Sequence, residues 1–186
     1  MKTIKIKDLM VPLEEYATVS MEDTLFDAVM ALEKAQEELD RSRYHYLHRA
    51  VLVFDKKDKI VGKISQLDVL KALEPKYDEM GDPGSLSKAG FSNSFLRDML
   101  TQYSLWDQPL AAICRKGSKI KVKDFMYTPT EGEYVDEEAT LEEGLHMLVV
   151  GRHHSLLVTR KNKITGVLRL TDVFNEIFQR MKACNL

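Results

Sequence analysis

Two stretches of the sequence place an aspartate just after an apolar, strand-like run. Ser65 precedes Asp68 by three residues, and Thr171 stands directly before Asp172. An ionised aspartate offers paired acceptor oxygens, which can take both hydroxyls of a vicinal diol. Where a strand enters a helix, free N–H groups and the positive end of the helix dipole also favour an anion. The same residues would equally serve as a helix N-cap followed by an acid in the first turn.

Basic residues stand where two further strands are expected to begin. His48 and Arg49 precede the first of these strands, and Arg152, His153 and His154 precede the second. Arginine can bind phosphate, although such residues are also typical of a solvated strand entry. Adjacent residues of a strand point to opposite faces, so His153 and His154 are not expected to form a metal-binding pair.

The elements that must position these residues occur twice. Residues 5–10 (KIKDLM) return as residues 121–126 (KVKDFM) at an offset of 116, with four of the six positions identical. Residues 59–62 return as residues 163–166 at an offset of 104, so the first copy carries about a dozen extra residues. A solenoid needs three or more repeats, and two copies favour a pseudo-symmetric pair of small units.

Each copy predicts the same order of elements: strand, helix, strand, strand, helix. Thr24 with Asp27, and Thr140 with Glu143, have the spacing of helix N-cap pairs. The first helix of the first copy is expected to continue through residues 37–41, which would account for the extra residues. Apolar runs separated by charged turns predict strands at residues 50–54, 60–64, 156–158 and 164–168, and the last helices are expected at 67–73 and 171–181.

The predicted fold is therefore α+β, with two β-α-β-β-α repeats packed with pseudo-two-fold symmetry and a connecting helix. The repeats span residues 1–74 and 119–186, and the connector spans residues 75–118. The connector begins with a Pro- and Gly-rich loop and continues as an amphipathic helix over residues 94 to about 113. This helix would either cover an open face of the core or dock onto a partner.

The composition excludes several classes of protein. Hydrophobic residues make up 44% and charged residues 30%, which is typical of a globular chain. Lys and Arg number 27 against 29 Asp and Glu, without the basic excess that non-specific nucleic-acid binding requires. The two cysteines, Cys114 and Cys184, argue against a disulfide framework or a zinc site. The sequence contains no apolar run of membrane-spanning length and no signal-peptide core, which predicts a cytoplasmic protein without membrane insertion.

The repeated motifs resemble a tandem pair of CBS domains, often called a Bateman module. The family binds adenosine-containing ligands in the clefts between its two repeats and regulates an attached or associated enzyme, channel or transporter. The resemblance implies a non-catalytic sensor that binds AMP, ADP, ATP or S-adenosylmethionine, requires no other cofactor, signals to an unidentified protein and forms a homodimer. The likeness covers about residues 3–74 and 119–182. It is carried by three pairs of matching segments: the KDLM and KDFM entries, residues 24–25 and 140–141, and residues 62–68 and 166–172.

The resemblance also assigns residues to a site. Asp68 and Asp172 stand at the family's ribose position, and Ser65 stands where the family has a Ser or Thr that contacts ribose or phosphate. Arg169 replaces that residue in the second copy, where it could pair with a phosphate or fill the cleft and block it. Thr171 could supply a hydroxyl there instead.

The remaining ligand contacts follow from the same resemblance. Phosphate contacts are expected from His48, Arg49, Arg152, His153 and His154. The slot for adenine is expected from the segment after the entry Met of the opposite repeat, where an aromatic ring such as that of Tyr134 could stack on the base. The residues concerned are Val11, Pro12 and Ala17, or Thr128, Pro129 and Tyr134.

Two other functions compete with a nucleotide sensor. The first is an interaction module whose clefts do not bind a ligand, which the replacement by Arg169 favours. The second is an enzyme such as a nucleotide hydrolase, but the sequence contains no P-loop, no Gly-x-Ser-x-Gly and no His-Glu-x-x-His motif. Acidic residues 136–138 and 142–143 are interpreted as a solvated helix start rather than as a cation site.

Overall fold

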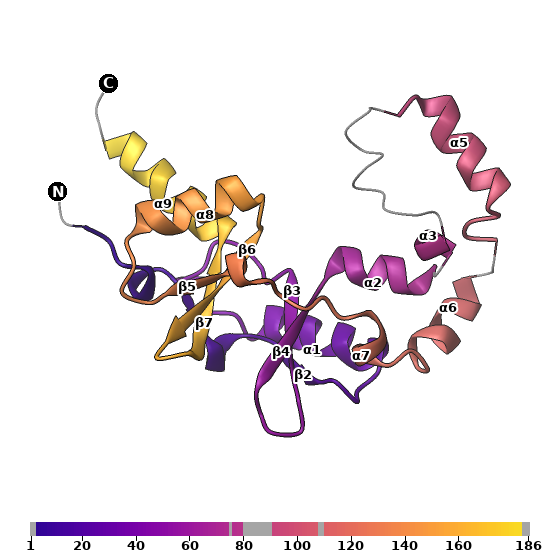
Figure 1. Cartoon of the computed structure of the whole chain (residues 1–186), viewed down its shortest axis with the longest axis horizontal. Coiled ribbons are helices and arrows are strands. Elements are labelled where there is room, and N and C mark those ends of the chain that lie inside the picture. The colour runs from indigo at the N-terminus through magenta and orange to yellow at the C-terminus, as the bar shows by residue number, and fades with distance from the viewer. Residues whose placement is uncertain (1–2, 75, 80–90, 108–109, 184–186) are drawn as a thin grey trace.

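Two small sheets with helices around them form the protein (Figure 1). The structure is a computed structural model that describes residues 3–74, 76–79, 91–107 and 110–183. One sheet has the strand order β2-β3-β4 and the other the order β1-β7-β6-β5. The glycines and prolines of the predicted connector loop, and Cys184, lie outside the described residues.

The two repeats share one topology. The first contains β2 (Thr18–Ser20), α1 (Leu25–Glu37), β3 (Ala50–Phe54), β4 (Ile60–Ser65) and α2 (Gln66–Leu73). The second contains β5 (Tyr134–Asp136), α8 (Leu141–Gly151), β6 (Ser155–Arg160), β7 (Lys163–Arg169) and α9 (Leu170–Ala183). In each repeat the first strand pairs parallel with the second, and the second pairs antiparallel with the third. The predicted order of strand, helix, strand, strand, helix is confirmed.

The first helix of each repeat begins where the sequence predicts. Thr24 accepts a hydrogen bond from the Asp27 N–H at 3.2 Å, and the Asp27 carboxylate accepts one from the Thr24 N–H at 2.9 Å. Thr140 and Glu143 repeat this arrangement at α8, with distances of 3.3 and 2.7 Å. These reciprocal bonds satisfy N–H groups that have no partner within the helix.

The entry segment of each repeat packs against the other repeat. The 3₁₀ turn η1 (Ile6–Asp8) and β1 (Val11–Pro12) stand at the start of the first repeat, yet β1 pairs antiparallel with β7, which belongs to the second. Helix α7 (Val122–Phe125) stands at the start of the second repeat, yet the N–H of Val122 donates to the carbonyl of Asp23 in the first at 2.9 Å. The two halves are therefore interlocked.

The hydrophobic cores follow this exchange. Fully buried Ile6 packs with Leu141 and Leu168 in the core of the second repeat. Val122 is packed among the core residues of the first repeat. A Cβ on Gly166 would lie 2.5 Å from the carbonyl oxygen of Val11, so the entry segment approaches β7 too closely for any other residue there. Each repeat thus depends on a segment of the other for a closed core.

The extra residues of the first copy form a turn instead of more helix. Because α1 ends at Glu37, the prediction that it continues through residue 41 is wrong. Asp40 accepts hydrogen bonds from the N–H and the hydroxyl of Ser42 at 2.9 and 2.6 Å, a local pairing that favours turns over helix. Leu39 and Tyr44 are buried in a cluster that joins the two repeats, together with Val11, Tyr16, Leu52, Leu157 and Val167.

The connector contains α3 (Lys76–Glu79), α5 (Asn93–Gln102) and α6 (Leu110–Gly117) instead of one long helix. Ser104 and Trp106 interrupt it with φ values of 48° and 60°, which a continuous right-handed helix does not allow. Helix α6 packs against α1 and α2, as a covering connector would. Helix α5 lies apart from both sheets in Figure 1 and presents the exposed apolar residues that a docking helix requires: Phe95, Leu96 and Leu100. No helix of the described chain is long and apolar enough to span a membrane.

Candidate functional site

A cleft of about 450 Å³ lies between the two repeats. Its walls come from the junction of β4 and α2, from the junction of β7 and α9, from the segment after α7, and from the residues that lead into β3 and β6. A cleft of this volume can hold one small-molecule ligand. Eight of the eleven residues singled out in the sequence line it: Arg49, Ser65, Asp68, Arg152, His153, His154, Arg169 and Thr171.

Ser65 and Asp68 form a capping box at the start of α2. The N–H and the hydroxyl of Ser65 both donate to Oδ2 of Asp68, at 2.7 and 2.6 Å. The hydroxyl oxygen of Ser65 accepts from the Asp68 N–H at 3.3 Å, which confirms the helix-cap interpretation. Within the described residues, the second carboxylate oxygen of Asp68, Oδ1, accepts no hydrogen bond. Asp68 can therefore cap the helix and still accept hydrogen bonds from a ligand.

A buried carboxylate lies beside this capping box. Glu133, the last residue of the 3₁₀ turn η3 (Glu131–Glu133), is 1% exposed. It accepts hydrogen bonds from the hydroxyl of Tyr127 at 2.6 Å and the N–H of Thr130 at 3.1 Å, and it forms an ion pair with Lys63. Burial opposes its ionisation, but these bonds outweigh burial and hold the pKa of the Glu133 carboxyl below its ordinary value.

The ring of Tyr127 forms a flat surface in the cleft. The hydrogen bond to Glu133, followed by burial, raises the pKa of the Tyr127 hydroxyl and keeps it protonated. Nζ of Lys63 lies 5.2 Å from the centre of the ring, and Tyr127 as a whole is 40% exposed. A ring held at its hydroxyl end in this way can stack on an aromatic ligand.

No motif of the sequence points to Lys63, Tyr127 or Glu133, but a comparison of the two copies distinguishes them. At the offsets of the repeat, each matches an apolar residue that is buried in the structure. The pairs are Tyr127 with Val11, Glu133 with Ala17, and Lys63 with Val167. Polar residues at positions that are apolar in the other copy distinguish one cleft from the other.

Cationic side chains line the same cleft. Neither Arg49 nor Arg152 forms an ion pair within the described residues. Arg152 ends α8 in the left-handed conformation, with φ of 52°. A Cβ on the preceding residue, Gly151, would lie 2.1 Å from Nε2 of His153, so the imidazole packs directly against this glycine. The described part of the chain has no group of three or more side chains placed to hold a metal ion.

The second copy differs at the corresponding strand–helix junction. Arg169 stands at the position of Ser65, and its Nε and Nη2 donate to the two carboxylate oxygens of Asp172, the Nη2 bond being 2.8 Å long. Both residues are buried, with 4% and 8% of their surface exposed. Both oxygens of Asp172 thus accept a hydrogen bond, whereas only one oxygen of Asp68 does so from the residues that the structure describes.

His48 lies against the same arginine. Its Nδ1 is 3.2 Å from Nη1 of Arg169, and the ring is fully buried. Burial, with the nearby guanidinium, lowers the pKa of His48 to about 4, so the imidazole is neutral at physiological pH. His48 and Asp172 do not line the cleft, and neither does Tyr134 on β5.

None of the six residues expected around the base lines this cleft. Val11 and Pro12 form β1 against β7, and Ala17 is buried in the core of the first repeat. Thr128 and Pro129 follow Tyr127 but do not line the cleft. Among the residues after the two entry methionines, the cleft is lined by Tyr16, Tyr127 and Glu133.

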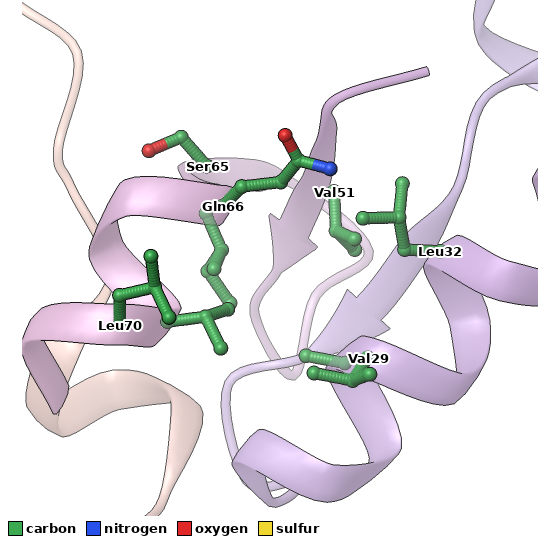
Figure 2. Close-up of a pocket in the computed structure, with 9 residues that line it drawn as sticks. Val29, Leu32, Val51, Ser65, Gln66 and Leu70 are labelled. Carbon is green, nitrogen blue, oxygen red and sulfur yellow. The ribbon is translucent and has the colours of Figure 1, made fainter. Parts of the chain in front are cut away.

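A separate groove of about 400 Å³ lies in the first repeat between α1 and α2. Figure 2 shows Val29 and Leu32 of α1 on one side and Leu70 of α2 on the other, with Val51 of the sheet between them. No charged residue lines this groove. It is therefore unsuited to a phosphorylated ligand. The groove forms part of an apolar surface on α1 and α2.

Comparison with known proteins agrees with this architecture. Residues 6–75 and 122–179 match the model of the CBS domain family. The chain is similar to CBSX2 from Arabidopsis thaliana, with 18% identity and a TM-score of 0.60 over 97% of this chain and 99% of that one. It is also similar to a CBS domain-containing protein from Bacillus anthracis, with 17% identity and a TM-score of 0.61 over 95% and 94% of the two chains. A structure of CBSX2 in complex with AMP matches with 19% identity and a TM-score of 0.57 over 94% and 97%.

No curated protein matches the sequence significantly. The two regions that match the family model together cover more than half of the chain, and the repeats they contain have the same strand pairing. The chain therefore belongs to the CBS domain family, as a tandem pair of CBS domains.

Proposed function

We propose that this chain is a regulatory protein that binds an adenine nucleotide in the cleft between its repeats. The free Oδ1 of Asp68 carries the proposal, because a half-occupied carboxylate can accept hydrogen bonds from ribose hydroxyls. The ring of Tyr127 offers a stacking surface for adenine, and Arg49 and Arg152 offer guanidinium groups for phosphate. The AMP complex of the similar protein CBSX2 supports this class of ligand.

The charge of the cleft favours AMP, ADP or ATP over S-adenosylmethionine. Arg49 and Arg152 line the cleft without an ion-pair partner among the described residues, so they can neutralise phosphate groups. S-adenosylmethionine has no phosphate, and its sulfonium cation would be repelled by the same guanidinium groups.

We propose a regulatory and non-catalytic role because the cleft draws on both repeats. Asp68 comes from the first repeat and Arg152 from the second, so a nucleotide that contacts both has different affinities for different arrangements of the two. Helix α5 offers exposed apolar residues to the regulated protein. A cytoplasmic location stays a prediction from composition.

The binding site is tested by titrating the protein with AMP, ADP, ATP and S-adenosylmethionine in a calorimeter. We expect Asp68→Asn to weaken nucleotide binding about 10- to 100-fold, because it removes a charge-assisted hydrogen bond worth about 1.5–3 kcal/mol. Asp27→Asn is the matched control: it makes the same change in the capping box of α1, outside the cleft, and should leave affinity unchanged.

The same titrations test the base contact. Tyr127→Ala should weaken binding about 5- to 100-fold, the usual effect of removing an aromatic ring from a stacked base. Tyr134→Ala, which removes a ring outside the cleft, should have no effect. If none of the four ligands binds to the wild-type protein, the proposal is wrong and an interaction module becomes the better account.

A homodimer is the second part of the proposal. Large apolar side chains, each at least 39% exposed, gather on α1, α2, α8 and α9, and the groove of Figure 2 adjoins those on α1 and α2. Exposed apolar surface of this extent is typical of an interaction site. The residues are Phe26, Val29, Met30, Leu67, Leu70, Val149, Val150, Phe174, Phe178 and Met181.

Sedimentation equilibrium should therefore give twice the chain mass of 21.4 kDa. Replacing the stacked pair on α9, Phe174→Asp with Phe178→Asp, should shift the protein towards the monomer. Phe95→Asp, which changes an exposed phenylalanine on α5, serves as the control and should leave the mass unchanged. A wild-type protein that sediments as a monomer would refute this part.

A further inference from the structure

The two strand–helix junctions of this chain are alike in backbone and opposite in side-chain chemistry. Ala50 pairs with Ser65 across β3 and β4, and Ser155 pairs with Arg169 at the same place across β6 and β7. An aspartate follows three residues later in both copies, as Asp68 and as Asp172. The difference lies in the residue that holds each aspartate.

Arg169 is fixed by several groups at once. Besides its two hydrogen bonds to Asp172, its Nη1 donates to the carbonyl of Tyr46 at 3.1 Å and lies 3.2 Å from Nδ1 of His48. Its Cζ lies 5.2 Å from the centre of the Tyr44 ring, within the range of a cation–π contact. Tyr44 and His48 are themselves buried. The guanidinium is thus enclosed by residues of the loop that the first repeat adds after α1.

We infer that Arg169 closes a latent second nucleotide site, by occupying with its own guanidinium the carboxylate that would otherwise accept ribose hydroxyls. This inference rests on the proposed function of the first cleft. A bidentate guanidinium engages both oxygens of Asp172, and only 8% of this residue is exposed, so a diol has no access to the remaining lone pairs. The chain then binds one nucleotide, held by the copy that has serine at this position.

The inference also accounts for the contrast between the two base slots. Lys63, Tyr127 and Glu133 line the open cleft. Their counterparts in the second copy are Val167, Val11 and Ala17, all buried. The second slot is therefore lined by buried apolar residues, and its aspartate is held by the arginine.

Arg169→Ser tests the inference directly, because it restores the serine–aspartate spacing of the first repeat. AMP and ATP are the probes, and native mass spectrometry with calorimetry counts the nucleotides bound. The wild-type protein should bind one nucleotide per chain and Arg169→Ser should bind two. Arg169→Gln is the second variant, should the serine variant fail to fold; it removes the guanidinium fork and should also admit a second nucleotide.

A measurement on the wild-type protein tests the same inference without a substitution. Saturation with ATP should slow hydrogen exchange at residues 62–70, 125–128 and 152–155, and leave unchanged residues 9–12, which are the counterparts of 125–128 at the second slot and do not line the cleft. Protection of residues 9–12 as well as 125–128, two nucleotides per wild-type chain, or one nucleotide on every variant would overturn the latent site alone. Absence of binding to the wild type and to both variants would overturn the proposed function as well.

Discussion

Replacing Asp172 with alanine is expected to lower the free energy of unfolding by about 3–5 kcal/mol. The substitution leaves Arg169 buried with two donors that have lost their acceptor, and an uncompensated buried charge is far more costly than the loss of an exposed ion pair. Urea unfolding followed by circular dichroism measures the effect as a shift of the midpoint at constant slope.

The control is the same change at the matching position of the first repeat. Asp68→Ala removes a helix-cap partner that holds no buried cation, so we expect a loss of about 1 kcal/mol. The double variant Arg169→Met with Asp172→Leu should recover most of the stability, because apolar residues of similar volume carry no desolvation penalty. Equal losses for Asp68→Ala and Asp172→Ala would show that the arginine does not depend on its partner.

The side-chain contacts at the junction of β7 and α9 were only partly predictable from the sequence. The three-residue spacing of Arg169 and Asp172 equals that of Ser65 and Asp68, and that spacing brings the two side chains of a strand–helix corner together. What the spacing leaves open is whether the guanidinium points to the aspartate or outwards to a phosphate. The answer depends on Tyr46 and His48, which lie more than 120 residues away in the chain.

The parts of the fold that depend on short local sequence motifs were predicted most accurately. The boxes at Thr24 and Thr140 need only four consecutive residues, and both helices begin there. The end of α1 was mistaken because Asp40 bonds to Ser42, a competition between side chain and backbone that apolar spacing does not register. The connector was mistaken for one helix for a similar reason, since Ser104 and Trp106 carry no glycine or proline signal for positive φ.

Non-local pairing explains what the sequence could not reveal about the first cleft. Lys63 and Glu133 are 70 residues apart, and lysine and glutamate side chains are normally exposed to solvent. Their burial follows from the exchange of entry segments, which brings Tyr127 against β4 through paired hydrogen bonds of 2.9 Å with Lys63. Elements of two to four residues have no periodicity of their own, so their partner strand cannot be inferred from pattern alone.

The exchange itself leads to a prediction in which each substitution acts on the opposite half of the chain. Ile6→Ala should destabilise the protein by about 2–5 kcal/mol, the usual effect of removing a fully buried isoleucine side chain. Its contacts lie in the second repeat, where a Cβ on Gly144 would come within 2.6 Å of its Cδ1. Hydrogen exchange should therefore rise first in α8 and β7, more than 130 residues away in sequence.

Val122→Ala is the mirror-image control. Val122 is fully buried in the core of the first repeat, so its truncation should raise exchange first in α1 and β3, which precede it in the chain. The crossed pattern distinguishes interlocked repeats from two repeats that fold separately and then dock. If Ile6→Ala loosened residues 18–73 and Val122→Ala loosened residues 134–183, the entry segments would belong to their own repeats. The cleft depends on the exchange, because the exchange pairs Tyr127 with Lys63 of β4. That structural basis would then be lost.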